Sequence, residues 1–217
     1  MAMLAAGRRS LYRYAGDRVL DGYARHCGLP SGIGRLCLLD DQVLAKVVET
    51  VGIPTKSSVL DIGCGRGFLA RWLLWNSLSC RYVGVESAAG LAPGEGPKFD
   101  RVFALETTPR VISSTLAKCI AQNLAPGGQY VVTLASFDEP HAEKIARSSA
   151  RLQRQGATVR AIDLTQQVRE FALTLYSAML MGRWAPAVSG HVLNEAARML
   201  HAVEFGSFNY TLLTGSV

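Results

Sequence analysis

Residues 59–70 read VLDIGCGRGFLA, and this short stretch joins a strand, a turn and the start of a helix. The segment up to Ile62 is apolar enough for a buried parallel strand, and the residues from Phe68 onward have the apolar spacing of a helix. Three glycines alternate between them, and glycine lets the backbone bend sharply, adopt positive φ and approach a ligand closely. These glycines are Gly63, Gly65 and Gly67. The stretch therefore predicts a nucleotide-binding turn in an α/β fold.

An acidic residue, Asp61, stands inside the predicted strand just before the glycines. Backbone N–H groups at a helix N-terminus bind a pyrophosphate best without a carboxylate beside them, so Asp61 disfavours a dinucleotide. The string DIGCGRG at 61–67 resembles motif I of the class I S-adenosylmethionine-dependent methyltransferases. The resemblance implies S-adenosyl-L-methionine as cofactor, whose cationic sulfonium and ammonium groups suit a carboxylate. The cofactor-binding residues that it implies in this loop are Asp61, Gly63, Cys64, Gly65 and Gly67.

A second strand is predicted over 81–86, where RYVGVE ends in an acid. The spacing from the glycine loop is that of a carboxylate which holds ribose hydroxyls. Two oxygens of one carboxylate can accept from two vicinal hydroxyls, which orients a nucleoside. We therefore expect Glu86 to be a cofactor-binding residue.

Two later segments extend the resemblance. The strand predicted over 99–106 is similar to the family's motif post-II, which places Glu106 with the cofactor and Thr107 and Thr108 with the substrate. A helix is predicted over 113–123, and the segment 124–134 then resembles the family's L-x-P-G-G turn and the strand that follows it. The resemblance covers most of the chain and implies a Rossmann-like class I methyltransferase fold.

The two ends of the chain are predicted to be helical. Residues 1–50 resemble the lid segment of small-molecule methyltransferases, and Asp40 or Asp41 is expected to cap a helix over 42–51. Residues 51–217 then form the methyltransferase-like domain, so that the whole is one compact domain. After residue 137 we expect a helix, a strand over 157–162, a helical insertion and a last strand over 208–213.

Substrate contacts and a general base are assigned more loosely. The substrate-binding candidates beyond the two threonines are Tyr23 in the lid and Trp184 in the helical insertion. Methyl transfer needs a base only when the acceptor must lose a proton. The candidate catalytic bases are His26, Tyr14 and His141, although a lone histidine is more often structural.

The segment 87–98 departs from the family pattern. A helix, a third strand and another helix should lie here, but the twelve residues SAAGLAPGEGPK carry three glycines and two prolines. We therefore predict a six-stranded sheet that lacks the usual third strand. The second strand then becomes an edge that can pair with another subunit, giving a homodimer. The acid that usually receives the adenine amino group is missing, unless Glu95 replaces it, and its loss weakens cofactor binding roughly 10- to 150-fold.

Composition sets limits on the other classes of function. The chain has 217 residues, of which 18% are charged and 49% hydrophobic, and no apolar run is long enough to span a bilayer. Five cysteines without framework spacing indicate a reducing cytoplasm, and four scattered histidines predict no metal site. The net charge of +6 comes from dispersed residues, so we expect no nucleic-acid partner. The segment LETTP at 105–109 also lacks the motif of enzymes that methylate nucleic-acid amino groups.

Two hypotheses follow. The first is methyl transfer to a small molecule, with natural products among the candidate acceptors. The second is a methyltransferase fold with weakened cofactor binding that serves as a cyclase or isomerase, or as a non-catalytic partner subunit. The shortened segment after Glu86, beside an intact glycine loop, is what motivates the second hypothesis.

Overall fold

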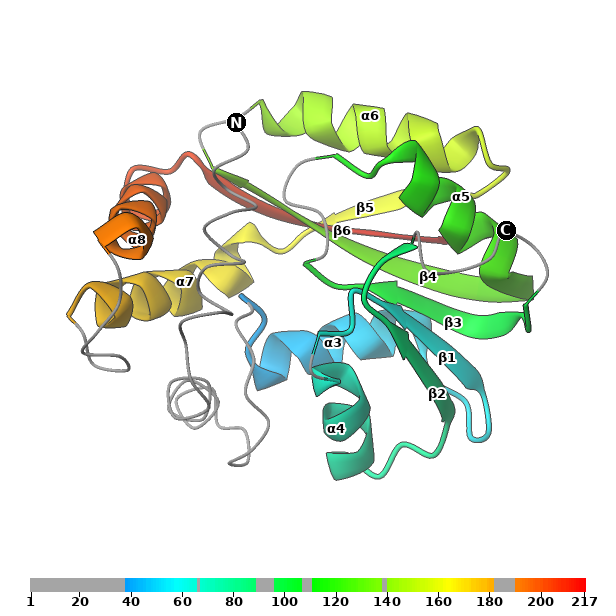
Figure 1. The fold of residues 1–217 in the computed structure, drawn as a ribbon. Helices are drawn as coiled ribbons and strands as arrows, with labels where there is room; N and C mark the ends of the chain where they lie inside the picture. Colours follow the sequence, from blue (N-terminus) through cyan, green and yellow to red (C-terminus); the bar gives the residue numbers. More distant parts are fainter. Residues whose placement is uncertain (1–37, 66, 89–95, 107–110, 138–139, 182–189) are drawn as a thin grey trace. The chain divides into compact units, whose positions relative to one another are not determined.

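The computed structural model describes residues 38–217 except residue 66 and residues 89–95, 107–110, 138–139 and 182–189. Elements carry the labels of Figure 1. In chain order they are α3 (Asp41–Val51), β1 (Ser58–Ile62), α4 (Phe68–Trp75), β2 (Arg81–Val85), β3 (Phe99–Ala104), α5 (Ser114–Asn123), β4 (Leu124–Phe137), α6 (His141–Gln153), β5 (Arg160–Asp163), α7 (Thr165–Leu180), α8 (Gly190–Glu204) and β6 (Phe208–Ser216).

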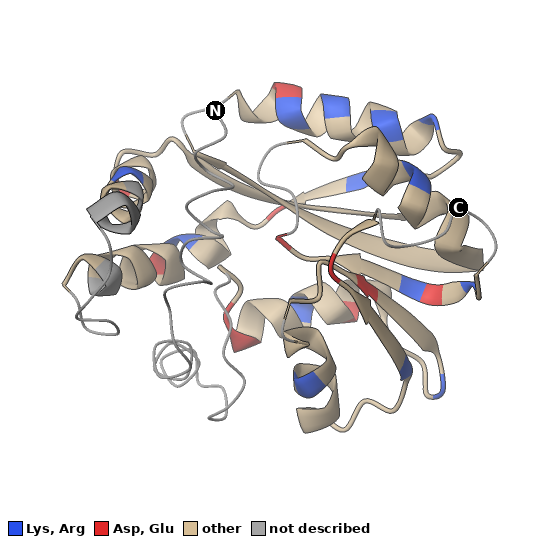
Figure 2. Cartoon of the chain, in the orientation of Figure 1, with Lys and Arg blue, Asp and Glu red and all other residues tan. Residues whose placement is uncertain are grey.

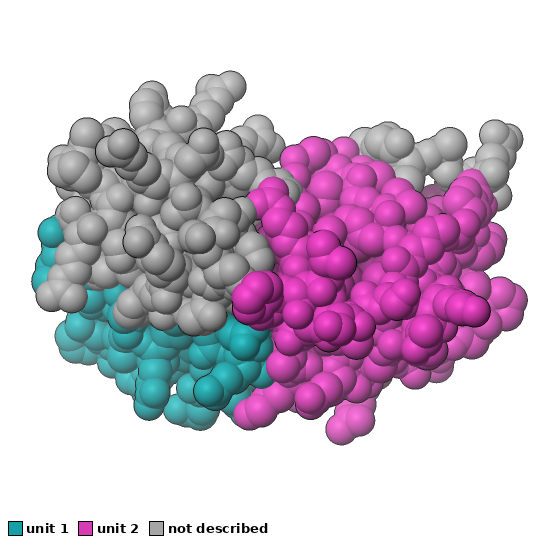
Figure 3. Space-filling model, turned by 90° about the horizontal axis from the view of Figure 1, so that it is seen from below, with its two compact units in different colours: residues 1–44, 136–139, 164–209 teal, residues 45–135, 140–163, 210–217 magenta. Residues whose placement is uncertain are grey.

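The chain divides into two compact units, which Figure 3 colours separately. The helical unit comprises residues 1–44, 136–139 and 164–209 and contains α7 and α8. The sheet unit comprises residues 45–135, 140–163 and 210–217 and contains the glycine loop. The predicted boundary near residue 50 stays a prediction.

In the described residues, six strands form one sheet in the order β2-β1-β3-β4-β6-β5. The strands β2, β1, β3 and β4 run parallel, whereas β6 runs antiparallel to β5. The prediction of a six-stranded sheet with β2 at one edge is therefore confirmed. All residues of β1 are buried, whereas β2 is partly exposed along its length, as expected for a central and an edge strand.

Helices cover both faces of the sheet in the sheet unit (Figure 1): α5 and α6 lie on one side, and α3 and α4 on the other. The core beneath α5 takes alternate residues of each strand, since successive strand side chains point to opposite faces. Its strand members include Leu60, Ile62, Val102, Ala104, Tyr130, Val132 and Leu213. The residues between them, Asp61 among them, consequently point to the other face.

Local signals explain where several elements begin and end. The Asp40 side chain accepts a 2.7 Å hydrogen bond from Val43 N and caps α3, so of the two predicted caps Asp40 is the one observed. The Ser113 hydroxyl caps α5 by accepting from Leu116 N. Within β4, Gly127 has φ 73°, a conformation that favours glycine, at the point where the register with β3 shifts.

Several predicted strand limits differ from the observed ones. The strand expected to reach Glu106 ends at Ala104, because Glu106 takes a left-handed conformation with φ 53°. β5 begins at Arg160, later than predicted, and Thr158 N instead donates to Ser216 O. β6 continues to Ser216, beyond the predicted limit.

The helical unit is held by an aromatic and aliphatic core. Phe137 packs edge-on against Tyr176 with ring centroids 6.2 Å apart and lies 5.1 Å from the ring of Phe208. Phe171 and Leu175 on α7 are also buried. The apolar spacing of α7 therefore serves packing in the described part of this unit.

Candidate functional site at the carboxyl ends of the parallel strands

The glycine loop follows β1 and leads into α4. Gly63, Gly65 and Gly67 have φ values of 79°, 53° and 73°, so all three occupy the left-handed region that glycine tolerates best. For Gly65 and Gly67, apart from the glycine itself and its two chain neighbours, no heavy atom of the described residues lies within 4 Å of a Cβ built on the backbone. The loop thus combines a glycine-dependent backbone with open space at two of its glycines.

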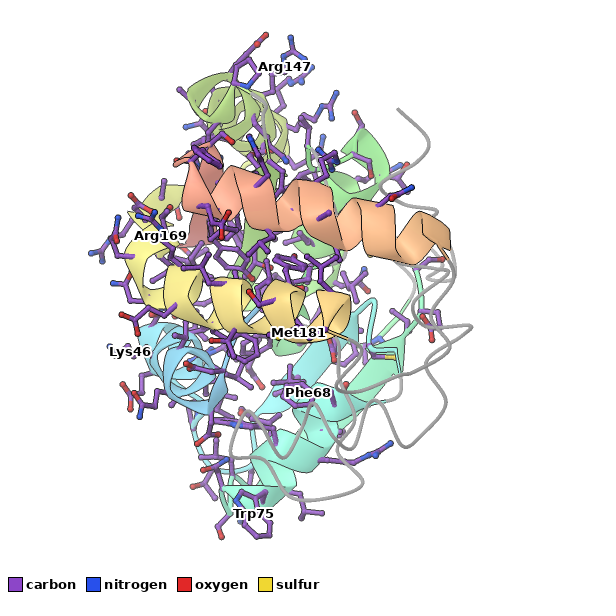
Figure 4. The ribbon with its side chains drawn as sticks, turned by 90° about the vertical axis from the view of Figure 1, so that its left-hand side faces the viewer. Lys46, Phe68, Trp75, Arg147, Arg169 and Met181 are labelled. Carbon is purple, nitrogen blue, oxygen red and sulfur yellow. The ribbon has the colours of Figure 1, made fainter. Side chains whose placement is uncertain are left out.

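Hydrogen bonds fasten the loop to the end of the neighbouring strand. Gly63 N and Cys64 N both donate to Val85 O, at 2.6 and 3.1 Å, and Gly67 N donates to Cys64 O at 2.9 Å. Gly67 also serves as the left-handed N-cap of α4, whose first residue is the buried Phe68 (Figure 4). These bonds fix the loop beside Val85 and hence beside Glu86, the next residue.

Asp61 is buried, with 4% of its surface exposed, and its Oδ2 atom accepts a 2.5 Å hydrogen bond from Tyr82 Oη. A buried carboxylate requires such a donor, because desolvation disfavours its charge. Tyr82 lies on β2 and was not among the residues predicted from the sequence. The signal that would have found it is the alternation within RYVGVE, which puts Tyr82 and Gly84 on one face.

Cys64 lies near two carboxylates, those of Asp61 and Glu86. Burial raises the pKa of its thiol, and the nearby charges of Asp61 and Glu86 raise that pKa further. The thiol therefore stays protonated at neutral pH and is a poor nucleophile. Asp61 and Glu86 are thus both close enough to Cys64 to affect its thiol, and we call these three residues with Tyr82 the glycine-loop cluster. Glu86 itself is exposed.

Glu106 lies just beyond the end of β3, the strand that pairs with β1 on the side opposite β2. Glu106 has a left-handed backbone, and its N donates to Thr133 Oγ1 at 2.7 Å. Its side-chain Oε1 accepts a second hydrogen bond from Tyr210 Oη at 3.0 Å. Thr133 and Tyr210 are buried. Neither was predicted, and no local pattern could reveal a contact across 104 residues of chain.

His141 lies at the start of α6, where Nε2 is 2.7 Å from Thr211 Oγ1. Burial lowers the pKa of His141, the charge of Lys144 lowers it further, and Asp163 opposes this shift. Thr211 lies two residues before Leu213 on β6, so the two side chains point to the same face of the sheet. Leu213 packs beneath α5 together with Leu60 and Ile62. His141 consequently lies on the face of the sheet opposite Asp61, and we call His141, Lys144 and Thr211 the α6 cluster.

The remaining predicted residues lie outside the described part of the chain. They are Tyr14, Tyr23, His26, Glu95, Thr107, Thr108 and Trp184. Their roles stay predictions.

Two other kinds of site are absent from the described residues. No group of three or more His, Cys, Asp or Glu side chains there could hold a metal ion. Of the helices in that part of the chain, none is both long and apolar enough to cross a membrane.

No protein-family model matches the sequence, and no curated protein sequence matches it. Solved structures do match. Phosphoethanolamine N-methyltransferase 2 of Haemonchus contortus, in complex with S-adenosyl-L-methionine, superposes with a TM-score of 0.67 at 14% identity over 96% of this chain. The chain spans 58% of that protein's length.

Two further structures match over nearly their whole length. Mycolic acid cyclopropane synthase, complexed with S-adenosylhomocysteine, superposes with a TM-score of 0.66 at 12% identity over 94% of this chain and 96% of that one. A [4+2]-cyclase, SpnF, superposes with a TM-score of 0.55 at 19% identity over 91% of this chain and 90% of that one. The chain therefore has the Rossmann-like fold of the class I S-adenosylmethionine-dependent methyltransferases.

Proposed function

We propose that this protein binds S-adenosyl-L-methionine and transfers its methyl group to a small molecule. The observation that carries the proposal is the buried Asp61 beside a loop whose glycines are left-handed, with open space at Gly65 and Gly67. A Cβ at either position would project into that space, where the ligand would lie. The residues present therefore fit the cofactor.

The donor set also suits the chemistry of the cofactor. The Asp61 carboxylate, fixed by Tyr82, would hold the cationic amino-acid part against the glycine loop. The exposed Glu86 carboxylate would accept from the two ribose hydroxyls. Gly63 and Cys64 would shape the loop through their bonds to Val85 O, while Gly65 and Gly67 would let the ligand approach.

When bound, the cofactor supplies an electrophilic methyl group on a sulfonium. The protein's own part is then to orient the acceptor and to keep water away, which accounts for much of the rate in reactions of this kind. Thr107, Thr108, Tyr23 and Trp184 are the proposed acceptor contacts. Among the proposed bases, His141 has the weakest support, because it lies on the face opposite Asp61.

The basic residues on α6, coloured blue in Figure 2, favour a small acceptor over a nucleic acid because two of them bond to other groups of the protein. Arg147 is paired with Glu143 on the same helix, and Arg151 donates to Ile112 O at 2.6 Å. Arg147 and Arg151 thus have partners within the protein, which supports a small acceptor over a nucleic-acid backbone. Two neighbours of this fold are named for different small molecules, phosphoethanolamine and mycolic acid.

Isothermal titration calorimetry with S-adenosylhomocysteine tests the cofactor site directly. We expect binding by the wild-type protein and a loss of about 100-fold in Asp61→Asn, because the charge of the carboxylate is removed. Glu143→Gln on the far side of α6 is the matched control and should bind normally. Absence of binding by the wild-type protein at millimolar ligand would rule out the proposed methyl transfer.

A second candidate is a cyclase or isomerase, or a non-catalytic partner subunit, that keeps this fold. It is supported by the short link from Glu86 to Phe99 and by the match to a [4+2]-cyclase. A methyl-labelled cofactor separates the two candidates: label in the product supports transfer, whereas product formed without label and without added cofactor supports the cyclase.

A homodimer formed through the β2 edge is also proposed. β2 is the edge strand of the sheet, and its Val83 side chain is 37% exposed. Light scattering after gel filtration distinguishes a dimer of about 47 kDa, twice the 23.4 kDa of one chain, from a monomer.

A further inference from the structure

Asp61 and Tyr82 lie on adjacent parallel strands and on the same face of the sheet. The register of β1 and β2 pairs Asp61 with Gly84 and Val59 with Tyr82. On β2, Tyr82 therefore lies two residues before Gly84, the residue directly opposite Asp61, and its side chain points to the same face. The tyrosine ring spans the distance between the two positions, and Tyr82 Oη donates to Asp61 Oδ2 at 2.5 Å.

Gly84 occupies the position that the tyrosine ring must pass. A Cβ built there would lie 3.1 Å from Tyr82 Cε1 and 2.9 Å from both Cβ and Sγ of Cys64. A side chain at residue 84 would thus clash with both Tyr82 and Cys64 and displace them. The absence of a side chain at Gly84 leaves the space through which Tyr82 reaches Asp61.

From this arrangement we infer that Tyr82 is a positioning residue for the cofactor: it orients the Asp61 carboxylate toward the amino-acid part of S-adenosylmethionine. The inference rests on the proposed function. A carboxylate held by a tyrosyl hydroxyl keeps one orientation before the ligand arrives, so less conformational freedom is lost on binding. Tyr82 touches Asp61 and acts through it.

Two nucleosides distinguish a positioning role from a structural one. S-Adenosylhomocysteine carries the amino-acid part that Asp61 would hold, whereas 5′-methylthioadenosine has the same adenosine and thioether without it. In Tyr82→Phe, calorimetry on the full chain should show about tenfold weaker S-adenosylhomocysteine binding and unchanged 5′-methylthioadenosine binding. A disordered loop would weaken the binding of both.

The matched control is Tyr130→Phe, which also removes one hydrogen-bonded tyrosyl hydroxyl. Tyr130 Oη donates to Thr158 O at 2.7 Å, on the face of the sheet opposite Asp61. This variant should bind both nucleosides as the wild type does. In an Asp61→Asn background, Tyr82→Phe should cause no further loss, because a positioning residue acts only through its partner.

The outcomes separate the two hypotheses. A wild-type protein that does not bind S-adenosylhomocysteine defeats the proposed function and this inference with it. If the wild type binds, an unchanged affinity in Tyr82→Phe overturns the positioning role alone. The positioning role is also overturned if Tyr82→Phe loses affinity equally for both nucleosides. It is overturned as well if the tenfold loss of affinity persists in the Asp61→Asn background.

Discussion

Two clusters of polar side chains lie on opposite faces of the sheet, the α6 cluster on one and the glycine-loop cluster on the other. In the α6 cluster, the buried Lys144 donates from Nζ to Ala135 O at 2.5 Å, and His141 contacts Thr211 at 2.7 Å. In the glycine-loop cluster, Asp61 is equally buried but lies beside glycines that face open space. Burial of a charged group thus has two uses here, support of the fold in the α6 cluster and, as proposed, ligand binding at the glycine loop.

The largest effect should come from Lys144→Ala. The substitution removes a buried aliphatic chain and leaves Ala135 O without its donor, so we expect the free energy of unfolding to fall by about 3 kcal/mol. Lys144→Met keeps the length of the chain and should lose about half as much. Urea unfolding measures both changes.

The same variants test whether the two clusters are independent. Lys144→Met should keep wild-type affinity for S-adenosylhomocysteine, whereas Asp61→Asn should lose affinity with little change in stability. If Lys144→Met lost affinity as strongly as Asp61→Asn, the two faces of the sheet could not be treated as separate in function.

Gly65→Ala should separate stability from binding at a single position. A left-handed alanine costs about 1 kcal/mol in stability. We expect S-adenosylhomocysteine affinity to fall by about tenfold or more, since the new methyl group enters the open space beside the loop. Thermal unfolding and calorimetry provide the two measurements.

Gly156→Ala is the matched control for that experiment. Gly156 also has positive φ, 84°, and a Cβ built there likewise has no heavy atom of the described residues within 4 Å, its own and its chain neighbours' atoms apart. It should lose a similar amount of stability and no affinity. Equal affinity losses in the two variants would mean that Gly65 acts only through the fold.

Much of the fold could be predicted from the sequence because the signals are local. The alternation in the strands, the Ser113 cap and the glycines after β1 each act within a few residues of chain. The short segment after Glu86 likewise predicted the six-stranded sheet, because a third strand has no room there.

The contacts that build the candidate site were harder to predict. The Tyr82 bond to Asp61 depends on the register of two strands, and the Tyr210 bond to Glu106 joins distant parts of the chain. Glu106 was expected to continue its strand, yet its backbone is left-handed and its N donates to the hydroxyl of Thr133, 27 residues away. His141 was a candidate base by residue type alone, and only the packing of α6 reveals its face.

A smaller effect is expected from the pH dependence of stability. The pKa of His141 is lowered in the folded protein by burial and by Lys144, so the unfolded chain binds a proton at higher pH than the folded one. The neutral histidine therefore contributes stability above the unfolded pKa of about 6.5, and this contribution is lost as pH falls through the folded pKa. Because His141 is only half-buried, we expect a change below about 1 kcal/mol.

Urea unfolding of wild type and His141→Gln between pH 7.5 and pH 5 measures this contribution. The stability of the wild type should fall more steeply with decreasing pH than that of the variant. Parallel curves would show that the pKa of His141 is the same in the folded and the unfolded protein. Lys144 would then be the only residue of the α6 cluster whose charge affects stability.

The smallest effect should come from Glu143→Gln, next to Lys144 in the chain. Glu143 and Arg147 form an ion pair one turn apart on α6, and their side chains are 54% and 62% exposed. Exposed pairs of this kind contribute at most about 0.5 kcal/mol and are screened by salt. Urea unfolding at low and high salt should therefore show a loss within that limit that shrinks as salt is added. A larger loss that is insensitive to salt would mean that the outer face of α6 supports the fold as its buried face does, so that burial alone would not distinguish Lys144 from its neighbour.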